Sequence, residues 1–557
     1  MKQIVVDLLK EVLKGKGIKL KDEEIEKYIE VPPSSELGDY AFPCFFLSAQ
    51  LKESPHEIAL EIREKIGDHS ADFDDIQTSG GYVNFFLNRR DFAKNLIDEI
   101  LKRKDKFGKS NIGKGKKVLI EHTSINPNAS PHLGRARNAI IGDSIVNIFS
   151  FLNFEPEVHY YVNDVSKQIA MLVMGDADKL EFKDMLNKYV EISKKAEEFQ
   201  DQIFFLLRQF EEGDEKVVRK FNKITKTCVE GQKKILSELG IKYDSFDYES
   251  KYLKKSKKLL LELKETKKLH KDREGRFYLD QKSTIVRKKM KSPVLVLTRS
   301  DGTGLYPLRD IVYTMEKMKK AKKNLWVLGE DHKLYFLQIK EALKLLGVES
   351  PEVIHYSFIL LKEKGKSKKM STRKGEVILL EDFLEKAIKK AEKETSKRSK
   401  KGEAKKVAIG AVKYTVLKNH PNKSILFNLD DALKFEGDTG PYILYSYARA
   451  SSILRKSKNK LDKIKNFETK DISESEIKLI KKLSQFPEII LKSYDNLNPS
   501  LIANYSYELA QTFNEFYHLS KVIGSKEELF RLGLVQSFRY VLKNSLNLLG
   551  IESLEKM

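Results

Sequence analysis

The spacing of apolar residues changes along the chain and divides it into distinct stretches. In residues 1 to about 90, the helical patterns Val5–Leu13 and His56–Ile66 precede an alternating segment, Gly81–Leu87, that is typical of a strand. These patterns predict a small α+β unit at the N-terminus. A connector rich in Lys and Gly, Lys109–Lys117, follows and marks its boundary.

From Val118 onward, short apolar runs alternate with helical patterns. Several runs are apolar along nearly their whole length, as expected for strands covered on both faces. Between the first two runs, Ile141, Ile145, Ile148 and Leu152 share one helical face. The alternation predicts a Rossmann-like, doubly wound parallel sheet. The expected strands are Val118–Ile120, Val158–Val162, Val294–Leu297, Leu325–Leu328 and Val353–Phe358.

The chain between the second and third expected strands is far longer than a crossover connection requires. Most of it, from Leu180 to about Leu263, is charged and helical, so we predict an inserted subdomain over about residues 170–290. The segment Glu392–Lys406 has no apolar stripe and is interpreted as an exposed helix or linker. Residues 407–557 show amphipathic helical patterns and no convincing strand, which predicts a helical bundle.

Together the patterns predict a multidomain α/β protein. We expect a small α+β N-terminal domain over residues 1–108, a Rossmann-like domain with a helical insertion over residues 109–391, and an all-α bundle over residues 392–557. A chain of 557 residues exceeds what one hydrophobic core normally holds, so several domains are expected on length alone.

Composition adds a strong positive charge to this picture. The chain has 103 Lys and Arg against 81 Asp and Glu, a formal net charge of +22. Such a surplus suits a polyanionic partner, because cations placed near phosphates release condensed counterions. A solvated, lysine-coated surface explains the charge equally well, so charge alone leaves nucleic-acid binding open.

Cysteine use and hydropathy bear on the compartment. Only Cys44 and Cys228 occur, with no CxxC pair and no Cys/His cluster, which favours a reducing cytosol over a disulfide framework or a zinc site. The N-terminus has neither a long apolar run nor a cleavage site, and no run of 18 apolar residues occurs in the sequence. We therefore expect a cytoplasmic protein with no membrane partner.

The most informative stretch is Val118–Asp143. An expected strand runs through a turn of Pro, Asn and Ser into a helix that opens with the sequence HLGR at His132. At such a turn, backbone N–H groups and the positive helix end face phosphates, Gly134 permits close approach, and the imidazole can donate to developing charge. An isolated H-x-G triplet is nevertheless more often an ordinary turn with a surface histidine.

A second basic motif, KKMSTRKG at residues 368–375, follows the fifth expected strand. Small and basic residues on such a loop can close over a triphosphate, although the loop is also explained as one more lysine-rich segment. His132 and Lys369 are 237 positions apart, yet they fall on the two halves of one predicted sheet. Strand ends from both halves meet at one crevice, so together the motifs predict a single ATP site.

HLGR and KMSTR, in that order, resemble the signature motifs of class I aminoacyl-tRNA synthetases. The residues around them narrow the resemblance to the arginyl-tRNA synthetase family, and the similarity covers nearly the whole chain. The supporting segments are Asn126-Pro127 before the first motif, Ile141-Gly142-Asp143 after it, KFEGDTGPY from Lys434, the C-terminal FNEFYHLSKV to LNLLGIESLEKM, and the N-terminal GDYAFP and GGYVNFFLN. Two positions depart from the family pattern: Arg135 replaces a histidine, and Thr372 replaces a lysine.

The resemblance implies a ligase that activates L-arginine with ATP and transfers the arginyl group to the 3′-terminal ribose of its tRNA. The intermediate is arginyl-adenylate, and the reaction needs positioning and charge stabilisation rather than a protein nucleophile. Mg²⁺ is expected to come with ATP and to need no dedicated protein site. The expected partners are the tRNA for arginine, L-arginine and ATP, and we expect a monomer.

The resemblance also assigns residues to roles. Catalytic roles fall to His132, Gly134, Lys369, Ser371 and Arg373. ATP binding falls to Pro131, His132, Gly134, Arg135, Gly329, Asp331, His332, Lys369, Met370 and Ser371. Arginine binding falls to Glu121, Ser124, Asn126, Tyr161, Asp164, Gln168, Tyr306 and Asp310. Contacts with tRNA fall to Asn84, Asn88, Tyr442, Tyr445 and Met557.

Physical chemistry supports the choice of an acidic pocket, because planar, bidentate pairing with a carboxylate separates arginine from lysine. By resemblance, Asp310 and Tyr306 face the guanidinium, while Glu121 and Asn126 lie near the α-amino group. Each assignment has an alternative: Asp310 as a helix N-cap or a partner of Arg309, for example, and at least one bundle tyrosine as core packing.

Three other classes of protein remain open at this point. Another class I synthetase would share the ATP motifs but lack the Glu121 and Asp310 pair. A non-catalytic, synthetase-like tRNA-binding protein would show degraded motifs. A simple adenylyltransferase would not need a further domain of about 150 residues.

Overall fold

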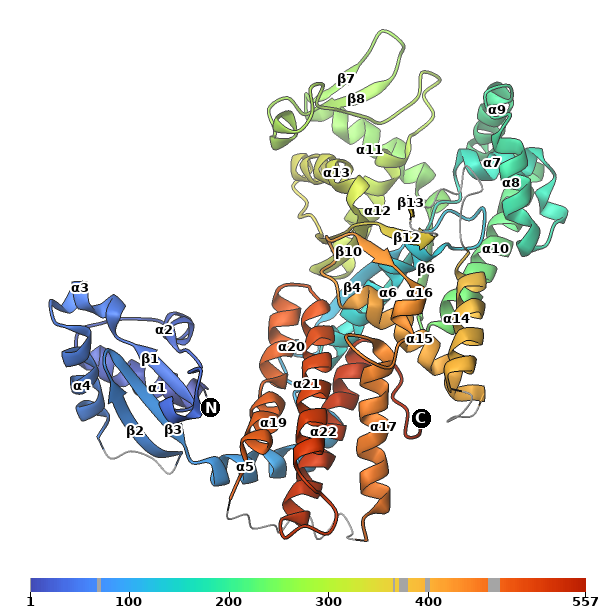
Figure 1. Ribbon diagram of the computed structural model, residues 1–557. Coiled ribbons are helices and arrows are strands. Elements are labelled where there is room, and N and C mark those ends of the chain that lie inside the picture. Colours follow the sequence, from blue (N-terminus) through green and yellow to red (C-terminus); the bar gives the residue numbers. More distant parts are fainter. Residues whose placement is uncertain (1, 68–71, 364–365, 370–378, 396–400, 459–470) are drawn as a thin grey trace. The chain divides into compact units, whose positions relative to one another are not determined.

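The computed structural model describes residues 2–67, 72–363, 366–369, 379–395, 401–458 and 471–557 (Figure 1). Internal contacts divide the chain into two compact units. The first unit comprises Met1–Lys104, Lys456–Ser484 and Glu515–Ser537, and the second comprises Asp105–Arg455, Gln485–Asn514 and Phe538–Met557.

An antiparallel sheet with the strand order β1-β3-β2 forms the centre of the N-terminal part of the first unit. Helix α4 begins at a capping box, in which Ser54 and Glu57 each accept the other's backbone N–H, and its apolar face, including Ile58 and Ile62, is buried. The predicted α+β unit is confirmed. Its elements are α1 (Lys2–Gly15), α2 (Asp22–Tyr28), β1 (Tyr40–Pro43), α3 (Ser48–Leu51), α4 (Pro55–Ile66), β2 (Phe73–Ser79), β3 (Tyr82–Leu87) and α5 (Arg89–Arg103).

Five parallel strands in the order β11-β10-β4-β5-β6 form the central sheet of the second unit. The strands are β4 (Lys117–Thr123), β5 (Glu155–Val162), β6 (Ser245–Tyr248), β10 (Lys323–Gly329) and β11 (Glu352–Tyr356). Because β4 pairs with β10 on one side and with β5 on the other, the strand order reverses there, and doubly wound sheets bind ligands at the carboxyl ends of the strands around such a point. The predicted doubly wound sheet is confirmed. Its connecting helices include α6 (Leu133–Phe151), α12 (Tyr306–Lys320) and α13 (Lys333–Leu345).

One of the expected strands does not belong to this sheet. The run at Val294–Leu297 was expected to be its third strand, but β9 (Val294–Val296) pairs antiparallel with β8 (Phe277–Asp280), which pairs with β7 (Leu269–Lys271). The third parallel strand is β6, which pairs with β5. An apolar run of four residues is compatible with a strand of a buried parallel sheet or of a small antiparallel sheet, so the apolar pattern alone could not distinguish the two.

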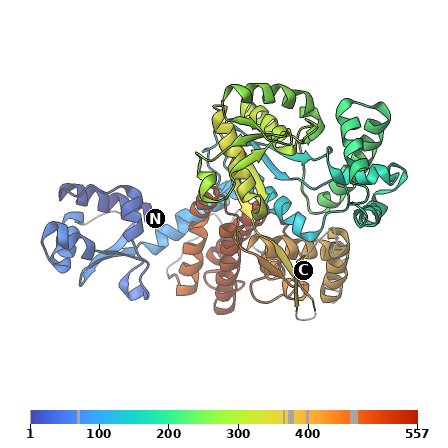
Figure 2. The same ribbon diagram turned by 90° about the horizontal axis from the view of Figure 1, so that it is seen from above.

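Because β6 lies within residues 170–290, that stretch contributes to the central sheet as well as to insertions. Before β6 lie four helices, which Figure 2 shows as one teal to green cluster. They are α7 (Lys167–Met174), α8 (Met185–Ser193), α9 (Gln200–Glu212) and α10 (Glu215–Glu238). After β6 come α11 (Leu253–Glu265) and the antiparallel sheet of β7, β8 and β9.

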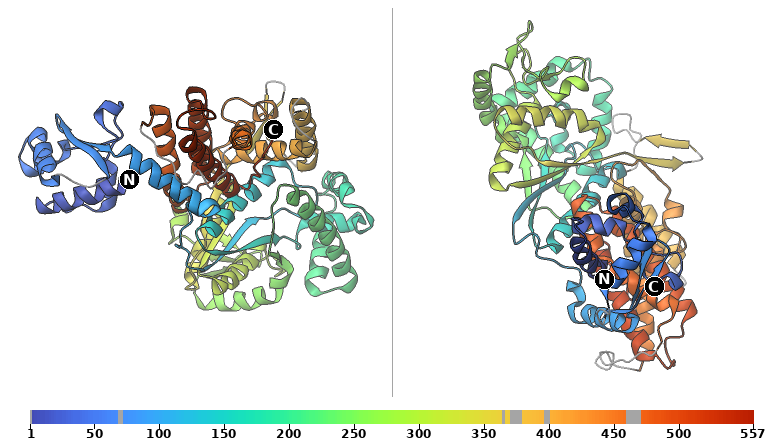
Figure 3. Two further views of the ribbon diagram at one scale, coloured as in Figure 1. Left: turned by 90° about the horizontal axis from the view of Figure 1, so that it is seen from below. Right: turned by 90° about the vertical axis from the view of Figure 1, so that its left-hand side faces the viewer.

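A third small sheet follows the parallel one. Strands β12 (Ile359–Glu363) and β13 (Lys366–Lys369) form an antiparallel hairpin, drawn as yellow arrows in Figure 3. Strand β14 (Ile425–Phe427) pairs parallel with β12. The expectation of no strand within residues 407–557 is therefore wrong, since three residues are too short to leave an alternating pattern.

Helices make up nearly all of the C-terminal part, as predicted. The segment Glu392–Lys406 is helical at both ends, because α14 extends to Thr395 and α15 begins at Lys401. Within the second unit, Phe513 and Phe538 stack with ring centroids 3.8 Å apart. The helices are α14 (Leu380–Thr395), α15 (Lys401–Leu417), α16 (Leu429–Ala432), α17 (Gly440–Lys456), α19 (Glu474–Ser484), α20 (Phe486–Asp495), α21 (Ser500–Leu519) and α22 (Glu528–Leu548).

Two sequence features considered above were the absence of long apolar runs and the presence of only two cysteines. Within the described residues, every helix is too short or too polar to span a bilayer. Cys44 and Cys228 are both buried, and burial raises the pKa of each thiol to about 12. Both thiols are therefore protonated and unreactive near neutral pH.

Candidate active site

Helix α6 begins at the first motif, and His132 is its N-cap. The His132 Nδ1 accepts the backbone N–H of Arg135 at 3.2 Å, which assigns the ring proton to Nε2. Burial, with the charge of Arg135 acting in the same direction, lowers the pKa of His132 to about 4, so the ring is neutral near pH 7. A neutral imidazole with its N–H on the second nitrogen can donate to a phosphate oxygen. Gly134 lies in the same first turn, where helix N–H groups lack intrahelical partners.

The rest of α6 is fixed by a buried arginine and by close contact with β4. The guanidinium of Arg137 is completely buried and donates to the carbonyl oxygens of Ser357 at 2.6 Å and Lys423 at 2.8 Å. Further along the helix, a Cβ atom at Gly142 would overlap the side chain of His122 on β4. These contacts hold the helix whose first turn carries the motif.

The second motif lies on a segment whose ends are described. Lys369 is the last residue of β13. Beyond the segment, Leu379 forms an antiparallel β-bridge with His132, and the N–H of Leu380 donates to the carbonyl oxygen of Pro131 at 2.8 Å. The chain therefore returns from the second motif directly to the first. Three predicted site residues of this motif, Met370, Ser371 and Arg373, lie outside the described residues, as does Thr372, which departs from the family pattern.

The end of β10 supplies the remaining residues expected at the nucleotide. Gly329 is its last residue, and Asp331 and His332 lie in the 3₁₀ helix Glu330–His332 that precedes α13. The His332 side chain is about half exposed, whereas Glu330 accepts a hydrogen bond from Ser357 Oγ at 2.6 Å. These residues lie at the carboxyl edge of the sheet, the edge at which β4 leads into the first motif.

Asp310, on α12, lies between two tyrosine hydroxyls. Tyr161 at the end of β5 donates to Oδ1 at 2.8 Å, and Tyr335 on α13 donates to Oδ2. Tyr306, one turn earlier on α12, is 51% exposed, and its ring centroid lies 5.1 Å from that of Tyr335. The structure therefore brings together three of the predicted arginine-binding residues and adds Tyr335, which sequence reasoning missed.

The two alternative roles for Asp310 are wrong. The N-cap of α12 is Leu305, five residues earlier, and Arg309 pairs with Glu249 instead. Burial raises the pKa of Asp310, and the hydroxyls of Tyr335 and Tyr161 act in the opposite direction. Hydrogen bonds from neutral donors stabilise the carboxylate without cancelling its charge.

Glu121, near the end of β4, is paired inside the protein. Its carboxylate contacts the ammonium of Lys317 on α12, and both side chains are nearly completely buried. Burial lowers the pKa of Lys317, and the Glu121 carboxylate acts in the opposite direction. Sequence reasoning missed Lys317, because α12 contains several lysines and the sequence does not show which of them is buried.

The turn after β4 is braced from the insertion. Gln232 on α10 is fully buried and donates to the carbonyl oxygens of Asn126 at 3.0 Å and Ala129 at 2.8 Å, while its own oxygen accepts from Tyr160. Ser124 and Asn126 are half-buried on this turn. Gln232 therefore positions the chain that leads into the first motif.

The remaining predicted arginine-binding residues lie just after β5. Asp164 is buried and accepts the backbone N–H of Ser250 at 2.8 Å. Burial raises its pKa, against the effect of that hydrogen bond. The side-chain oxygens of Asn163 and Gln168 are buried without a hydrogen-bond partner. Buried acceptors without a partner are suited to a ligand that carries N–H groups.

A second buried ion pair lies beside Asp310. The guanidinium of Arg309 contacts Glu249, which is completely buried, and lies 3.8 Å from Glu211. Burial raises the pKa of Glu249 to about 7, against the effect of Arg309. Sequence reasoning missed Glu249 and Glu211, because they lie on separate elements that only the fold brings to Arg309.

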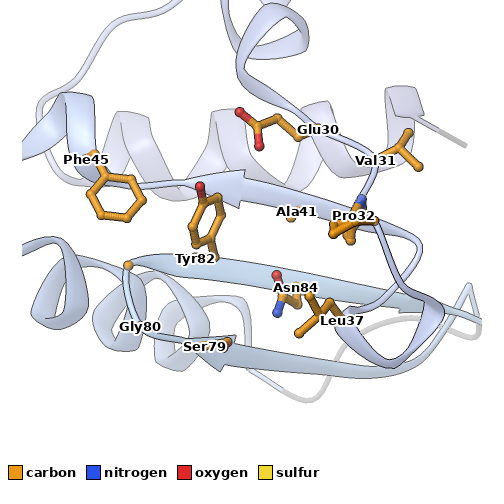
Figure 4. A pocket seen from close by; sticks show the side chains of 12 residues that line it. Glu30, Val31, Pro32, Leu37, Ala41, Phe45, Ser79, Gly80, Tyr82 and Asn84 are labelled. Atoms are coloured by element: carbon orange, nitrogen blue, oxygen red, sulfur yellow. The ribbon is translucent and has the colours of Figure 1, made fainter.

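The N-terminal domain holds a cavity of about 440 Å³ (Figure 4). Asn84 on β3 lines it together with the rings of Phe45 and Tyr82. Asn88, by contrast, uses its side chain to cap α5, accepting the N–H of Asp91 at 3.1 Å. Of the two asparagines predicted to contact tRNA, Asn84 alone lines this cavity.

The tyrosines of α17 have different environments. Tyr447 is completely buried and donates to Glu555 at 3.1 Å, which confirms that one of the three is core packing. Tyr445 is half-buried, with the guanidinium of Arg449 4.9 Å from its ring centroid. Tyr442 accepts a hydrogen bond from Asn514 at 2.9 Å.

Comparison with known proteins agrees with this geometry. Residues 96–429 match the family model "tRNA synthetases class I (R), catalytic domain", residues 1–87 match "Arginyl tRNA synthetase N terminal domain", and residues 443–557 match "DALR anticodon binding domain". Fold and site thus define a class I aminoacyl-tRNA synthetase, a class of enzyme that uses ATP.

Relatives specify the family. The chain is 37% identical to the arginine–tRNA ligase of Methanocaldococcus jannaschii, covering 99% of each chain, and 38% identical to that of Methanococcus aeolicus, covering 100% of each. Arginyl-tRNA synthetase from Thermus thermophilus has a TM-score of 0.79 at 26% identity, with 100% of each chain covered. The chain belongs to the arginine–tRNA ligase family. The predicted function, ligation of arginine to tRNA, is thereby confirmed.

Proposed function

We propose that Asp310 is the group that binds the guanidinium of the substrate arginine. The observation that carries this assignment is the environment of its carboxylate: both oxygens are oriented by tyrosine hydroxyls, and no Lys, Arg or His side chain of the described residues lies within ion-pair distance. A guanidinium can satisfy such a group with two parallel hydrogen bonds. Tyr306 and Tyr161 form the sides of the pocket.

The other end of the substrate lies toward β4 and β5. Asn126 and Ser124 on the turn after β4, with Asp164 and Gln168 after β5, are assigned to the α-amino group. The unsatisfied oxygen of Gln168 supports this, because an ammonium supplies the N–H donors that it lacks. Glu121 is paired with Lys317, so we assign it to shaping this part of the site and not to direct contact with the substrate.

The phosphates of ATP are assigned to the start of α6. His132 Nε2 and the backbone N–H of Gly134 are assigned to donate to them, Pro131 shapes the turn, and Arg135 adds positive charge. Gly329, Asp331 and His332 border the adenosine. From the second motif, Lys369, Met370, Ser371 and Arg373 are assigned to ATP and to the departing pyrophosphate.

The chemistry follows from this placement. The arginine carboxylate attacks the α-phosphorus of ATP in line, and pyrophosphate leaves to give arginyl-adenylate. The 3′-terminal ribose hydroxyl of tRNA then attacks the carbonyl carbon of the adenylate, and AMP leaves. Mg²⁺ bound together with ATP would offset the charge of the phosphates and would need no dedicated protein ligands. The protein contributes positioning and charge stabilisation, and no covalent intermediate with a side chain.

Transfer RNA is assigned to two surfaces. The N-terminal domain, residues 1–108, takes an unpaired base in the cavity at Asn84, with Asn88 nearby. The bundle, residues 392–557, is assigned to the anticodon, with bases stacking on Tyr445 and further contacts from Tyr442 and Met557. Residues 109–391 are assigned to catalysis. We propose a cytoplasmic monomer with no membrane partner, since the assigned sites all lie on one chain.

Kinetics of an Asp310→Asn variant test the central assignment. Losing a charge-assisted bidentate contact should raise the KM for arginine by roughly 100-fold and leave the KM for ATP within about threefold. The measurement is arginine-dependent exchange of labelled pyrophosphate into ATP in the presence of tRNA. Asp301→Asn, a change on the exposed loop before α12, is the control. Equal increases in both KM values would show a structural role and contradict the assignment.

A further inference from the structure

The buried ammonium of Lys317 lies next to the proposed guanidinium site. Lys317 is seven residues after Asp310 on α12, so the two side chains lie on one face two turns apart. Its side chain is 3% exposed and contacts Glu121 on β4. The ammonium also lies 4.1 Å from the ring centroid of Tyr313 and 4.7 Å from that of Trp326. An ammonium so surrounded by aromatic faces is held in one place.

Nearly every carboxylate around this pocket has its own partner. Glu121 has Lys317, Glu249 has Arg309, and Glu211 lies 3.9 Å from Arg299. Two further carboxylates are also occupied: Asp247 contacts His159, and Asp164 accepts a backbone N–H.

Asp310 differs from all of them. Among the described residues, the hydrogen-bond partners of its carboxylate are the hydroxyls of Tyr161 and Tyr335, and no Lys, Arg or His side chain lies within 4 Å of it. It is also half-buried rather than fully buried, so a ligand can reach it. Among the described residues, Asp310 is thus a carboxylate with no ion-pair partner within 4 Å.

We propose that Lys317 is a specificity-determining positioning residue, which neutralises Glu121 so that Asp310 alone presents uncompensated charge to the substrate. The proposal rests on the assignment of Asp310 to the guanidinium. A second free carboxylate would attract any cation, including the compact ammonium of lysine, whatever its shape. A single carboxylate with both oxygens already oriented favours a planar pair of donors. Specificity then depends on the neutralisation of Glu121 as well as on the free charge of Asp310.

Exchanging the pair in two steps tests this role. Glu121→Gln alone leaves Lys317 as an uncompensated cation, which repels the substrate, so the KM for arginine should rise about tenfold or more. Adding Lys317→Met removes that cation, and the double variant E121Q/K317M should return to within about threefold of the original KM. Lys320→Met, an exposed change on the same helix, is the control.

Two further measurements separate electrostatics from folding. The KM for ATP should stay constant throughout the series. Inhibition by L-citrulline, a neutral analogue of the same shape, should change less than threefold in E121Q, because repulsion acts only on a charged ligand. A double variant as poor as E121Q would show that Glu121 contacts arginine directly and would overturn the proposal. Parallel changes for arginine, citrulline and ATP would make the pair merely structural and would also overturn it.

Should E121Q fail to fold, K317M carries the test. It leaves Glu121 as the uncompensated group, so discrimination of arginine over lysine in pyrophosphate exchange should fall about tenfold, and E121Q/K317M should restore it. Unchanged discrimination would overturn the proposal. These results are independent of Asp310→Asn: failure of that variant to raise the KM removes the guanidinium assignment itself, whereas failure of rescue removes only the role of Lys317.

Discussion

The proposed arginine site and the proposed phosphate site are built differently. The proposed arginine site at Asp310 is made of side chains held by partners on other elements, such as Tyr161 on β5 and Tyr335 on α13. The proposed phosphate site at His132 is made largely of backbone: a helix N-terminus and a β-bridge to Leu379. Selecting one side chain among twenty requires shape and charge, whereas holding phosphates requires N–H groups and room to approach.

The largest effect on activity is expected from a substitution in the proposed phosphate site. In His132→Ala the donor to the nucleotide is lost, so kcat should fall by roughly 100-fold or more, as when a transition-state contact is removed. The KM for arginine should stay within about threefold. The measurement is aminoacylation with each substrate varied in turn. His420→Ala, a histidine outside the assigned site, is the matched control, and an unchanged kcat in His132→Ala would remove the imidazole from catalysis.

A smaller change should sharpen the contrast at the proposed arginine site. Tyr335→Phe deletes one hydroxyl that orients Asp310, so the KM for arginine should rise about tenfold while kcat at saturating arginine changes little. Pyrophosphate exchange at a series of arginine concentrations measures it. Tyr278→Phe, on the β7–β9 sheet, serves as the control. If kcat fell and KM did not, the hydroxyl would act on the reaction and not on recognition.

The smallest effect is expected far from the chemistry. Asn84→Ala changes a neutral amide at the edge of the N-terminal cavity, where one hydrogen bond to an unpaired base would be lost. The KM for tRNA should rise about threefold to tenfold, and tRNA-independent measures of arginine or ATP affinity should not move. Asn111→Ala is the comparison variant. A tRNA KM equal to that of the unchanged protein would remove Asn84 from the interface.

Much of the fold follows from apolar patterning. Strands β4, β5, β10 and β11 are long apolar runs, and they were predicted because a doubly covered strand leaves that pattern. Strand β6 has four residues and includes Asp247, whose carboxylate contacts His159 on β5, so its sequence does not look buried. Strand β9 is as apolar as a central strand but belongs to another sheet. The apolar pattern of a strand predicts whether it is buried, whereas the strand it pairs with depends on the fold of the whole chain.

The site divides in the same way. His132, Lys369 and Asp310 were predictable, because they lie in or beside motifs that are contiguous in sequence. Lys317 was not, since its partner Glu121 is 196 positions away and its helix contains several other lysines. Tyr335 and Gln232 were missed for a similar reason. Groups that position other groups are defined by three-dimensional neighbours and leave no local signal.

The contact between Gly142 and His122 has a consequence for how variation in this chain would be tolerated. Gly142 is the tenth residue of α6, and it has no space for even one methyl group, because the side chain of His122 on β4 already occupies that space. Any replacement must push α6 and β4 apart at this contact. The displacement would shift the first turn of α6, where the phosphates are assigned, although no residue assigned to ATP would have changed. A substitution at Gly142 would therefore reduce activity even though Gly142 is not assigned to any substrate.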